Sequence, residues 1–179
     1  MKKKSILGQV IFILITLLSC DKFLEETNIN PNDPTKVSPS ALLTPAELTL
    51  AYEYNANFSR WSGIFVQHVE GIARQQAGFN NYTFAGSNFE TDWSNLYVDV
   101  LQNLNIMINN STENGYNHFN GVGQILKAFT LLLMTDYWNH IPYKEAFDGI
   151  NNLQPIYDSQ ESIYSEVHSL LVSGSKSLN

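Results

Sequence analysis

The stretch VGQILKAFTLLLMTDYWNHIP, residues 122–142, decides the fold of this chain. Apolar residues recur in it at the three- and four-residue spacing of one helix face, at Val122, Ile125, Leu126, Phe129, Leu132, Leu133 and Trp138. From Phe129 to Met134 the stretch is apolar almost all round, so this helix is expected to lie centrally. Its length and Lys127 argue against a membrane span, which needs about 20 apolar residues. Pro142 is expected to follow the end of the helix, because proline cannot continue one.

Three further segments carry the same helical spacing, at residues 44–72, 89–108 and 158–178. The first is expected to start at Thr44-Pro45-Ala46-Glu47. There Thr44 can cap the helix, proline suits the first helical position, and Glu47 completes a capping box. The polar residues Asn55 and Asn57 interrupt the apolar stripe, so a break at that point is left open.

Polar loops are expected between these helices, at residues 73–88, 109–120 and 142–157, where Gly, Asn and Pro gather. After the last loop, Asp158 is expected to cap the final helix with Glu161 three residues on. No segment alternates apolar and polar residues as a half-buried strand does. The fold class is therefore mainly α. The third and fourth helices suit a tetratricopeptide-like pair, although no 34-residue self-similarity is visible.

The N-terminus has the parts of a secretory signal. Three lysines, Lys2 to Lys4, precede an apolar run at residues 6–18, which has the length of a signal's hydrophobic region. The run ends in Leu17-Leu18-Ser19-Cys20, which resembles a bacterial lipobox. The resemblance implies cleavage after Ser19 and attachment of lipid, palmitate included, to Cys20. An ordinary signal peptide, or a short buried helix with a chance cysteine, is the alternative.

Composition and charge then describe the remaining chain. Hydrophobic residues make up 44% of the sequence, enough for a packed core. Loss of residues 1–19 removes three of the ten basic residues and takes the formal net charge from −7 to −10. So acidic a chain does not suit nucleic-acid phosphates. The single cysteine leaves no partner for an internal disulfide.

The chain divides into three expected regions. Residues 1–19 are the lipoprotein signal peptide, residues 20–43 a lipid-anchored leader, and residues 44–179 one helical region. The leader opens with acidic residues at Asp21, Glu25 and Glu26. Their position resembles the surface-export signal of lipoproteins from Bacteroidota-type bacteria, and a solvated acidic linker is the equal alternative.

Catalytic and metal-binding patterns are sparse. The histidines stand without the close spacing of metal ligands, at positions His68, His118, His140 and His168. Neither a metal nor a cofactor is therefore expected. Glycoside hydrolysis needs two carboxylates that face one bond, and nothing in the sequence pairs them. We expect no enzyme, with a hydrolase that uses Glu70, Glu90 or Glu145 as an alternative.

Aromatic side chains are the better candidates for ligand binding. Phe79, Tyr82 and Phe84 lie in the polar loop 73–88. Rings on a loop can stack on sugar faces while amide and guanidinium groups bond the hydroxyls. The predicted ligand contacts are Arg74, Tyr82, Phe84 and Asn88. The alternative is that these rings fold back onto the core, where Trp61, Trp93 and Trp138 are expected to lie.

Four patches, in order, resemble the SusD/RagB family of outer-membrane nutrient-binding lipoproteins. They are Cys20-Asp21-Lys22-Phe23-Leu24-Glu25, Trp93-Ser94-Asn95-Leu96-Tyr97, Thr135 to Ala146, and Pro155 to Tyr164. The third patch reads TDYWNHIPYKEA, where the family commonly has Trp-Gly-Asp-Ile-Pro-Tyr-x-Glu-Ala. One departure is Asn139-His140 in place of Gly-Asp, which bears on how the helix ends.

This resemblance implies a helical binding protein, anchored by lipid and exposed at the cell outer membrane. It implies binding of an oligosaccharide or similar nutrient, and delivery to a TonB-dependent outer-membrane transporter (SusC-like), without catalysis. Family members run to several hundred residues, so the sequence suggests a truncated or incomplete chain. The alternatives are a helical scaffold that docks on the transporter without binding nutrient, and a fragment without function.

Overall fold

The computed structural model describes residues 37–179. The chain divides into two units, Met1–Val37 and Ser38–Asn179, and the fold described is that of the second. The predicted signal peptide and Cys20 lie outside the described residues. The elements of the second unit are α3 (Pro39–Glu53), η1 (Tyr54–Phe58), α4 (Ser59–Phe65), α5 (Gln75–Asn80), η2 (Gly86–Phe89), α6 (Glu90–Ser94), η3 (Asn95–Leu101), α7 (Gln102–Asn114), α8 (Asn117–Trp138), η4 (Gly149–Asn151) and α9 (Gln160–Leu178).

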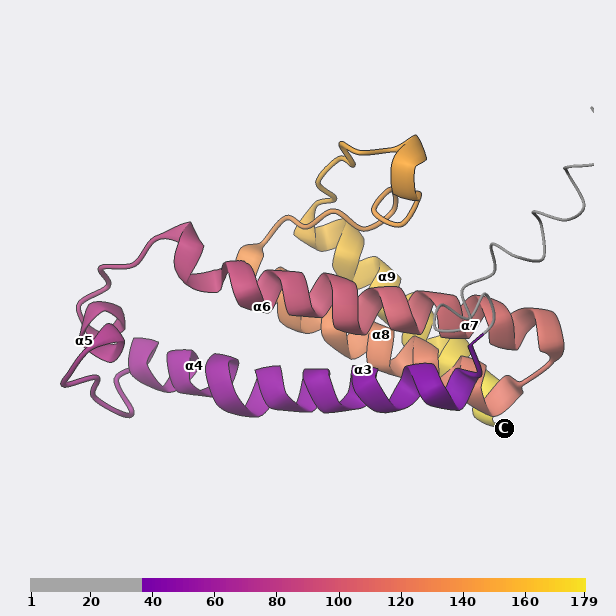
Figure 1. Cartoon of the computed structure of the whole chain (residues 1–179), viewed down its shortest axis with the longest axis horizontal. Helices are drawn as coiled ribbons and strands as arrows, with labels where there is room; N and C mark the ends of the chain where they lie inside the picture. The colour runs from indigo at the N-terminus through magenta and orange to yellow at the C-terminus, as the bar shows by residue number, and fades with distance from the viewer. Residues whose placement is uncertain (1–36) are drawn as a thin grey trace, which may run out of the picture. The chain divides into compact units, whose positions relative to one another are not determined.

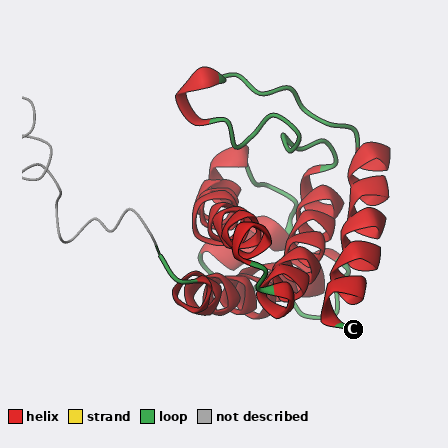
Figure 2. Cartoon of the chain, turned by 90° about the vertical axis from the view of Figure 1, so that its right-hand side faces the viewer, coloured by secondary structure: helices red, strands yellow, loops and turns green. Residues whose placement is uncertain are grey.

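These elements make four long helical rods that lie side by side (Figure 1). The first joins α3, η1 and α4, the second joins α6, η3 and α7, and α8 and α9 are the third and fourth. The end-on view shows the rods bundled together (Figure 2). Within residues 37–179 there is no strand, only one antiparallel bridge between Ile141 and Asp158. The mainly α prediction is therefore confirmed.

The α8 helix is the central rod, because it contacts α3, α7 and α9. Its buried side chains include Leu131, Met134 and Thr130, all fully shielded from solvent. This confirms the central position predicted from residues 122–142. Of the helices within residues 37–179, none combines the length and apolar character that crossing a membrane requires.

The first rod begins at Pro39 rather than at Thr44, so the predicted start is wrong. Ser38 is the N-cap, and its hydroxyl accepts a hydrogen bond from the Ala41 amide at 3.3 Å. Thr44 instead turns its hydroxyl back to donate to the Ser40 carbonyl at 3.3 Å. Pro45 lies inside the helix. The earlier start buries Pro39 and Leu42, which a start at Thr44 would have left outside the rod.

The end of the first rod also differs from the prediction. The helix stops at Phe65 instead of residue 72, because Gln67 adopts a φ of 58°, outside the right-handed helical region. The break left open at Asn55 and Asn57 is a π-helical turn, η1, within an unbroken rod. The second rod has a π turn as well, η3, which packs against α3.

A buried carboxylate pair lies where these two rods meet. Glu53 is fully buried and Asp92 almost so. The Glu53 carboxylate accepts from Asn95 Nδ2 at 2.6 Å and from Asn57 Nδ2 at 3.4 Å. Asn57 Nδ2 also donates to Asp92 Oδ1. Burial, and a hydrogen bond and repulsion from Asp92, raise the pKa of Glu53 above its ordinary value of 4.5.

Glu53→Gln should therefore change how stability depends on pH. Because the folded pKa is raised, the native state keeps a proton that the unfolded chain releases. Wild-type stability then falls as pH rises from about 4.5 through the folded pKa, by at most about 1.4 kcal/mol per pH unit. Glutamine can donate to Asp92 at every pH, so urea unfolding should show the stability of the variant rising relative to wild type as pH increases above about 4.5. Glu47→Gln, on the exposed face of α3, is the control; parallel curves for Glu53→Gln and wild type would contradict the prediction.

The break predicted at residues 109–120 is wrong in extent. The second rod continues to Asn114, and only Gly115 and Tyr116 separate it from α8. Gly115 has a φ of 71° and ends the rod in the left-handed conformation that glycine tolerates. Thr112 and Asn114 bond the carbonyls one turn back, at 2.8 Å each. Polar side chains on this outer face thus lie within the helix rather than interrupting it.

Glycines let α8 approach its neighbours closely. A Cβ added at Gly121 would lie 2.8 Å from the Gly174 carbonyl oxygen and 2.8 Å from Leu178 Cγ on α9. A Cβ at Gly123 would lie 2.7 Å from Met107 Cε on α7. The Gly121-Val122-Gly123 segment is thus a packing feature of the central rod, with one glycine against each neighbour.

Candidate functional site

Aromatic side chains gather where α4, α8 and the start of the second rod meet. Phe58 is buried and packs edge-on against Trp61, Tyr137 and Trp138, at centroid distances of 5.4, 4.4 and 5.7 Å. Trp138 also meets Trp93 edge-on at 5.1 Å. Such edge-to-face pairs each add about 0.5–1.5 kcal/mol beyond their buried area. The prediction that the tryptophans belong to the core is confirmed for Trp61, which is buried. Trp93 and Trp138 pack against the core but remain partly exposed.

Two adjoining hollows open beside this cluster, and together they are named the aromatic cleft. They share Gly86, Phe89 and Trp138 in their walls and measure about 390 and 370 Å³. Their sizes fall within the range of about 300–1,000 Å³ typical of small-molecule sites. The remaining lining residues are Phe65, Phe84, Ala85 and Tyr137 in one hollow, and Glu90, Trp93, His140 and Tyr157 in the other.

The predicted ligand loop contributes one of its rings to this cleft. Phe84 is 43% exposed and lines the cleft while packing on Phe65 and Phe89 at 5.2 and 5.6 Å. Phe79 is buried within the cluster. Tyr82 stacks on Phe65 at 6.2 Å, and its hydroxyl donates to the Phe65 carbonyl at 2.8 Å. The alternative that these rings fold back onto the core holds for Phe79, whereas Tyr82 packs on Phe65 but remains 55% exposed.

The other two predicted contacts lie outside the lining of the cleft. Arg74 is exposed, with a φ of 52°, and precedes the short helix α5, which the sequence had treated as loop. Asn88 uses its side-chain oxygen to accept a hydrogen bond from the Ala85 amide at 2.8 Å. Asn88 therefore supports the bend that presents Phe84, while Arg74, Tyr82 and Asn88 stay predictions as ligand contacts.

Sequence reasoning missed most of the cleft's walls. Trp93 and Trp138 had been assigned to the core, and His140 and Tyr157 had no assigned function. These residues come from three separate segments, and Tyr157 is 63% exposed. A signal was present in the third and fourth family-like patches, which contain Trp138, His140 and Tyr157.

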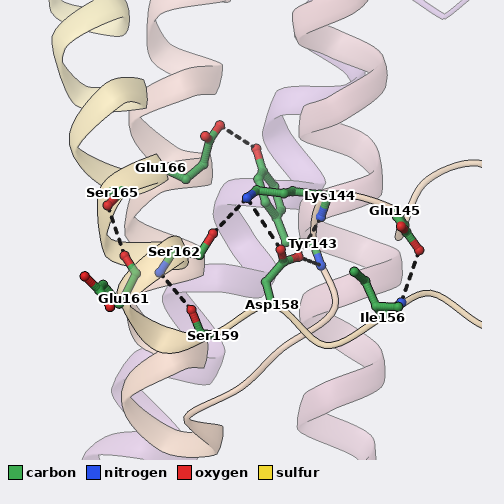
Figure 3. A network of polar contacts seen from close by, with 10 residues as sticks. All are labelled: Tyr143, Lys144, Glu145, Ile156, Asp158, Ser159, Glu161, Ser162, Ser165 and Glu166. Atoms are coloured by element: carbon green, nitrogen blue, oxygen red, sulfur yellow. Dashed lines mark hydrogen bonds and ion pairs between the residues drawn. The ribbon is translucent and has the colours of Figure 1, made fainter.

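The loop after α8 is held in place by the Asp158 carboxylate (Figure 3). Asp158 Oδ2 accepts from the Tyr143 and Lys144 amides at 3.1 and 2.9 Å. Lys144 Nζ lies 3.8 Å from Asp158 Oδ1. The prediction that Asp158 caps α9 is wrong, because Ser159 is the N-cap and accepts from the Ser162 amide at 3.3 Å. Asp158 instead ties the two ends of the loop together.

Tyr97 fixes the same loop from the second rod. Its hydroxyl donates to the Pro142 carbonyl at 2.6 Å, and its ring packs against Trp93 at 4.8 Å. Burial, with repulsion from Tyr157 and Asp158, raises the pKa of Tyr97 well above its usual range. The hydroxyl thus remains a donor at any physiological pH, and its hydrogen bond ties the loop to the second rod beside the cleft.

Candidate groups for catalysis and metal binding are scattered. Within residues 37–179, no three His, Cys, Asp or Glu residues gather as a metal site would require. Of the three carboxylates considered for hydrolysis, Glu90 lines the aromatic cleft and Glu145 lines a different cavity. Glu70 is exposed and belongs to neither lining. The cleft is thus built from aromatic rings with one carboxylate and one imidazole at its wall.

This arrangement of helical rods is that of one part of the SusD/RagB fold, as comparison with a solved structure shows. The chain aligns with a SusD/RagB family protein from Bacteroides thetaiotaomicron, with a TM-score of 0.71 and 20% sequence identity. The alignment covers 80% of this chain and 31% of that protein, so the chain spans about a third of its relative's length.

A SusD-like family, described as starch-binding and associating with the outer membrane, matches residues 31–178. The chain belongs to this family. The match confirms the family resemblance and covers three of the four sequence patches, while the patch from Cys20 to Glu25 lies before the matched residues. No curated protein matches the chain.

Proposed function

We propose that this protein binds an oligosaccharide in the aromatic cleft and delivers it to a TonB-dependent outer-membrane transporter. The observation that carries the proposal is the concentration of aromatic rings around the two adjoining hollows of the cleft, namely Phe84, Phe89, Trp93, Trp138 and Tyr157. Flat apolar rings suit the C–H faces of sugars, and Glu90 and His140 add polar groups that can bond hydroxyls. The starch-binding description of the family supports a glucan as ligand.

Localisation at the outer membrane follows from the family, and the mode of attachment is part of the proposal. Lipid on Cys20 would hold the chain at the membrane surface, with the residues between Cys20 and the start of α3 at Pro39 as the leader. More than one acyl chain gives stable anchoring, since each buried CH₂ contributes about 0.8 kcal/mol. A surface-exposed binder anchored in this way can meet a glycan before it enters the transporter.

Tyr157→Ala and Phe84→Ala are each expected to weaken binding of maltoheptaose by about tenfold, which corresponds to about 1.4 kcal/mol. Both rings line the cleft and are substantially exposed, so their removal should cost little stability. Isothermal titration calorimetry of the purified chain measures the change, and thermal melts check the fold. Tyr52→Ala is the matched control, because Tyr52 is 62% exposed on α3 and lies outside the lining of the cleft. If all three variants bound maltoheptaose with the affinity of the wild type, the cleft would be rejected as the glycan site.

A further inference from the structure

A second cavity, with a different chemistry, is also walled by residues of the loop after α8. It measures about 580 Å³ and shares no lining residue with the aromatic cleft. Three rods contribute to it, through Asn105 on α7, Lys127 on α8 and Glu166 on α9. Tyr143 and Phe147 from the loop also line the cavity, which is named the lysine cavity.

Lys127 is the unusual group in this cavity. It is only 8% exposed, and its Nζ donates to Asn105 Oδ1 at 3.0 Å. The Nζ lies 5.1 Å from the Tyr143 ring centroid and 5.8 Å from that of Phe147. Burial lowers the pKa of Lys127, while the charge of Glu166 opposes that change. An ammonium has three N–H donors, and Asn105 is the one acceptor recorded for them among the described residues.

An N–H donor of a buried ammonium that lacks an acceptor costs free energy, because it has lost its hydrogen bond to water. The other lysine at this cavity, Lys144, is already engaged by Ser162 Oγ at 2.9 Å and by Asp158. Lys127 therefore offers the donors that a bound molecule can use. The ring faces of Tyr143 and Phe147 beside it provide apolar contact.

The acidic groups of the cavity restrict the charge of that molecule. Glu145, Asp148 and Glu166 line it together with the two lysines. Tyr143 donates to Glu166 Oε1 at 3.0 Å, and Glu145 Oε2 accepts from the Ile156 amide (Figure 3). Glu145 Oε2 also accepts from Asn152 Nδ2 at 3.1 Å. These bonds leave further acceptor positions on the carboxylates. The two lysines nearly balance the three carboxylates, so the lining selects strongly for neither an anion nor a cation, whereas neutral hydroxyl groups can accept from the lysines and donate to the carboxylates.

We propose that the lysine cavity is a second carbohydrate subsite, which takes a neutral sugar ring. Hydroxyl oxygens accept from Lys127 Nζ, and hydroxyl protons are donated to Glu166. The inference rests on the proposed function, because both sites serve carbohydrate binding, but the residues are separate. The loop of residues 141–158 forms a wall of each, with Tyr157 at the aromatic cleft and Tyr143 at the lysine cavity.

The test uses three probes that share one ring and differ in charge: glucose, glucuronate and glucosamine. The purified chain is titrated with each while ¹H–¹⁵N NMR follows two sets of signals. The Phe147 and Lys144 amides report on the lysine cavity, and the Trp93 and Trp138 indoles report on the aromatic cleft. Glucose is expected to shift the Phe147 and Lys144 amides at concentrations at least tenfold lower than either charged probe requires.

Two variants assign the effect to the proposed groups. Lys127→Met keeps the length of the side chain without its donors, and should weaken the glucose response at Phe147 at least tenfold. Glu166→Gln should weaken it about fivefold. Lys176→Met, an exposed lysine near the end of α9, is the matched control and should leave it unchanged. Thermal melts confirm that each variant is folded.

Several results would overturn the inference. Stronger shifts with glucuronate or glucosamine would show a charged ligand, and shifts with glycylglycine in place of glucose would show a peptide site. Indole shifts without any change at Phe147 would leave the aromatic cleft standing and reject the second subsite. Shifts at Phe147 without any at the indoles would support the second subsite and count against the aromatic cleft. The two proposals can therefore fail separately.

Discussion

Asp158→Ala is expected to lower the free energy of unfolding by about 3 kcal/mol. The Asp158 side chain is nearly buried and accepts hydrogen bonds from two backbone amides, Tyr143 and Lys144. Hydrogen bonds to a charged group contribute about 1.5–3 kcal/mol, and the two amides would lose their shared acceptor. Chemical unfolding in urea measures the loss. Hydrogen exchange should also accelerate at the Tyr143 and Lys144 amides, because their protection depends on this carboxylate.

Asp158→Asn separates the hydrogen bonds from the charge. Both amides donate to the same oxygen, Oδ2, which an amide oxygen can replace. The charge itself faces Lys144, an exposed side chain at 3.8 Å, and such ion pairs contribute less than about 1 kcal/mol. The asparagine variant should therefore retain most of the stability. A loss as large as that of alanine would show that the charge, and not the shared acceptor, holds the loop.

The helical class and the central rod could be predicted from sequence because they depend on local periodicity. The spacing of apolar residues from Val122 to Trp138 identifies one helix wherever its partners lie. The limits of the helices were harder to predict, since caps compete. Thr44-Pro45 and Asp158 both have good capping chemistry, but Ser38 and Ser159 are the residues that cap. Thr44 and Pro45 lie inside a helix whose earlier start buries more apolar surface. Asp158 instead binds the backbone amides of the loop.

The candidate site was predictable only in part, because its walls are far apart in sequence. Phe84 could be identified, since an aromatic residue in a polar loop is an unusual combination. Trp93 and Trp138 were assigned to the core because helical tryptophans usually pack there, and both pack and line the cleft. The buried Lys127 gave no sequence signal beyond a charge within an apolar helix. Its environment depends on Asn105 and Tyr143, which only the packed rods and loop bring to it.

Gly121→Val is expected to cost at least about 3 kcal/mol of stability, because α8 and α9 touch through their backbones at this point. A Cβ on Gly121 would come 2.8 Å from the Gly174 carbonyl oxygen. A Cβ on Gly174 would come 3.0 Å from the Gly121 carbonyl oxygen, so neither helix can yield by rotating a side chain. Overpacking of this kind costs about 1–3 kcal/mol and more when backbone must move. Urea unfolding of the purified chain gives the difference.

Two other glycines make the comparison specific. Gly86→Val introduces the same side chain where no atom lies within 4 Å of the added Cβ, and should be close to neutral. Gly123→Val meets side-chain atoms rather than backbone, namely the flexible end of Met107 at 2.7 Å and Ile108 Cγ1 at 2.8 Å, and its loss of stability should fall between those of the other two variants. Equal losses of stability in Gly121→Val and Gly123→Val would mean that the α9 backbone shifts to accept the added side chain as easily as the side chains on α7 do. The graded order would instead show that α9 is held against α8 at one fixed distance. Glu166 on α9 and Lys127 on α8 would then face the lysine cavity from a rigid frame.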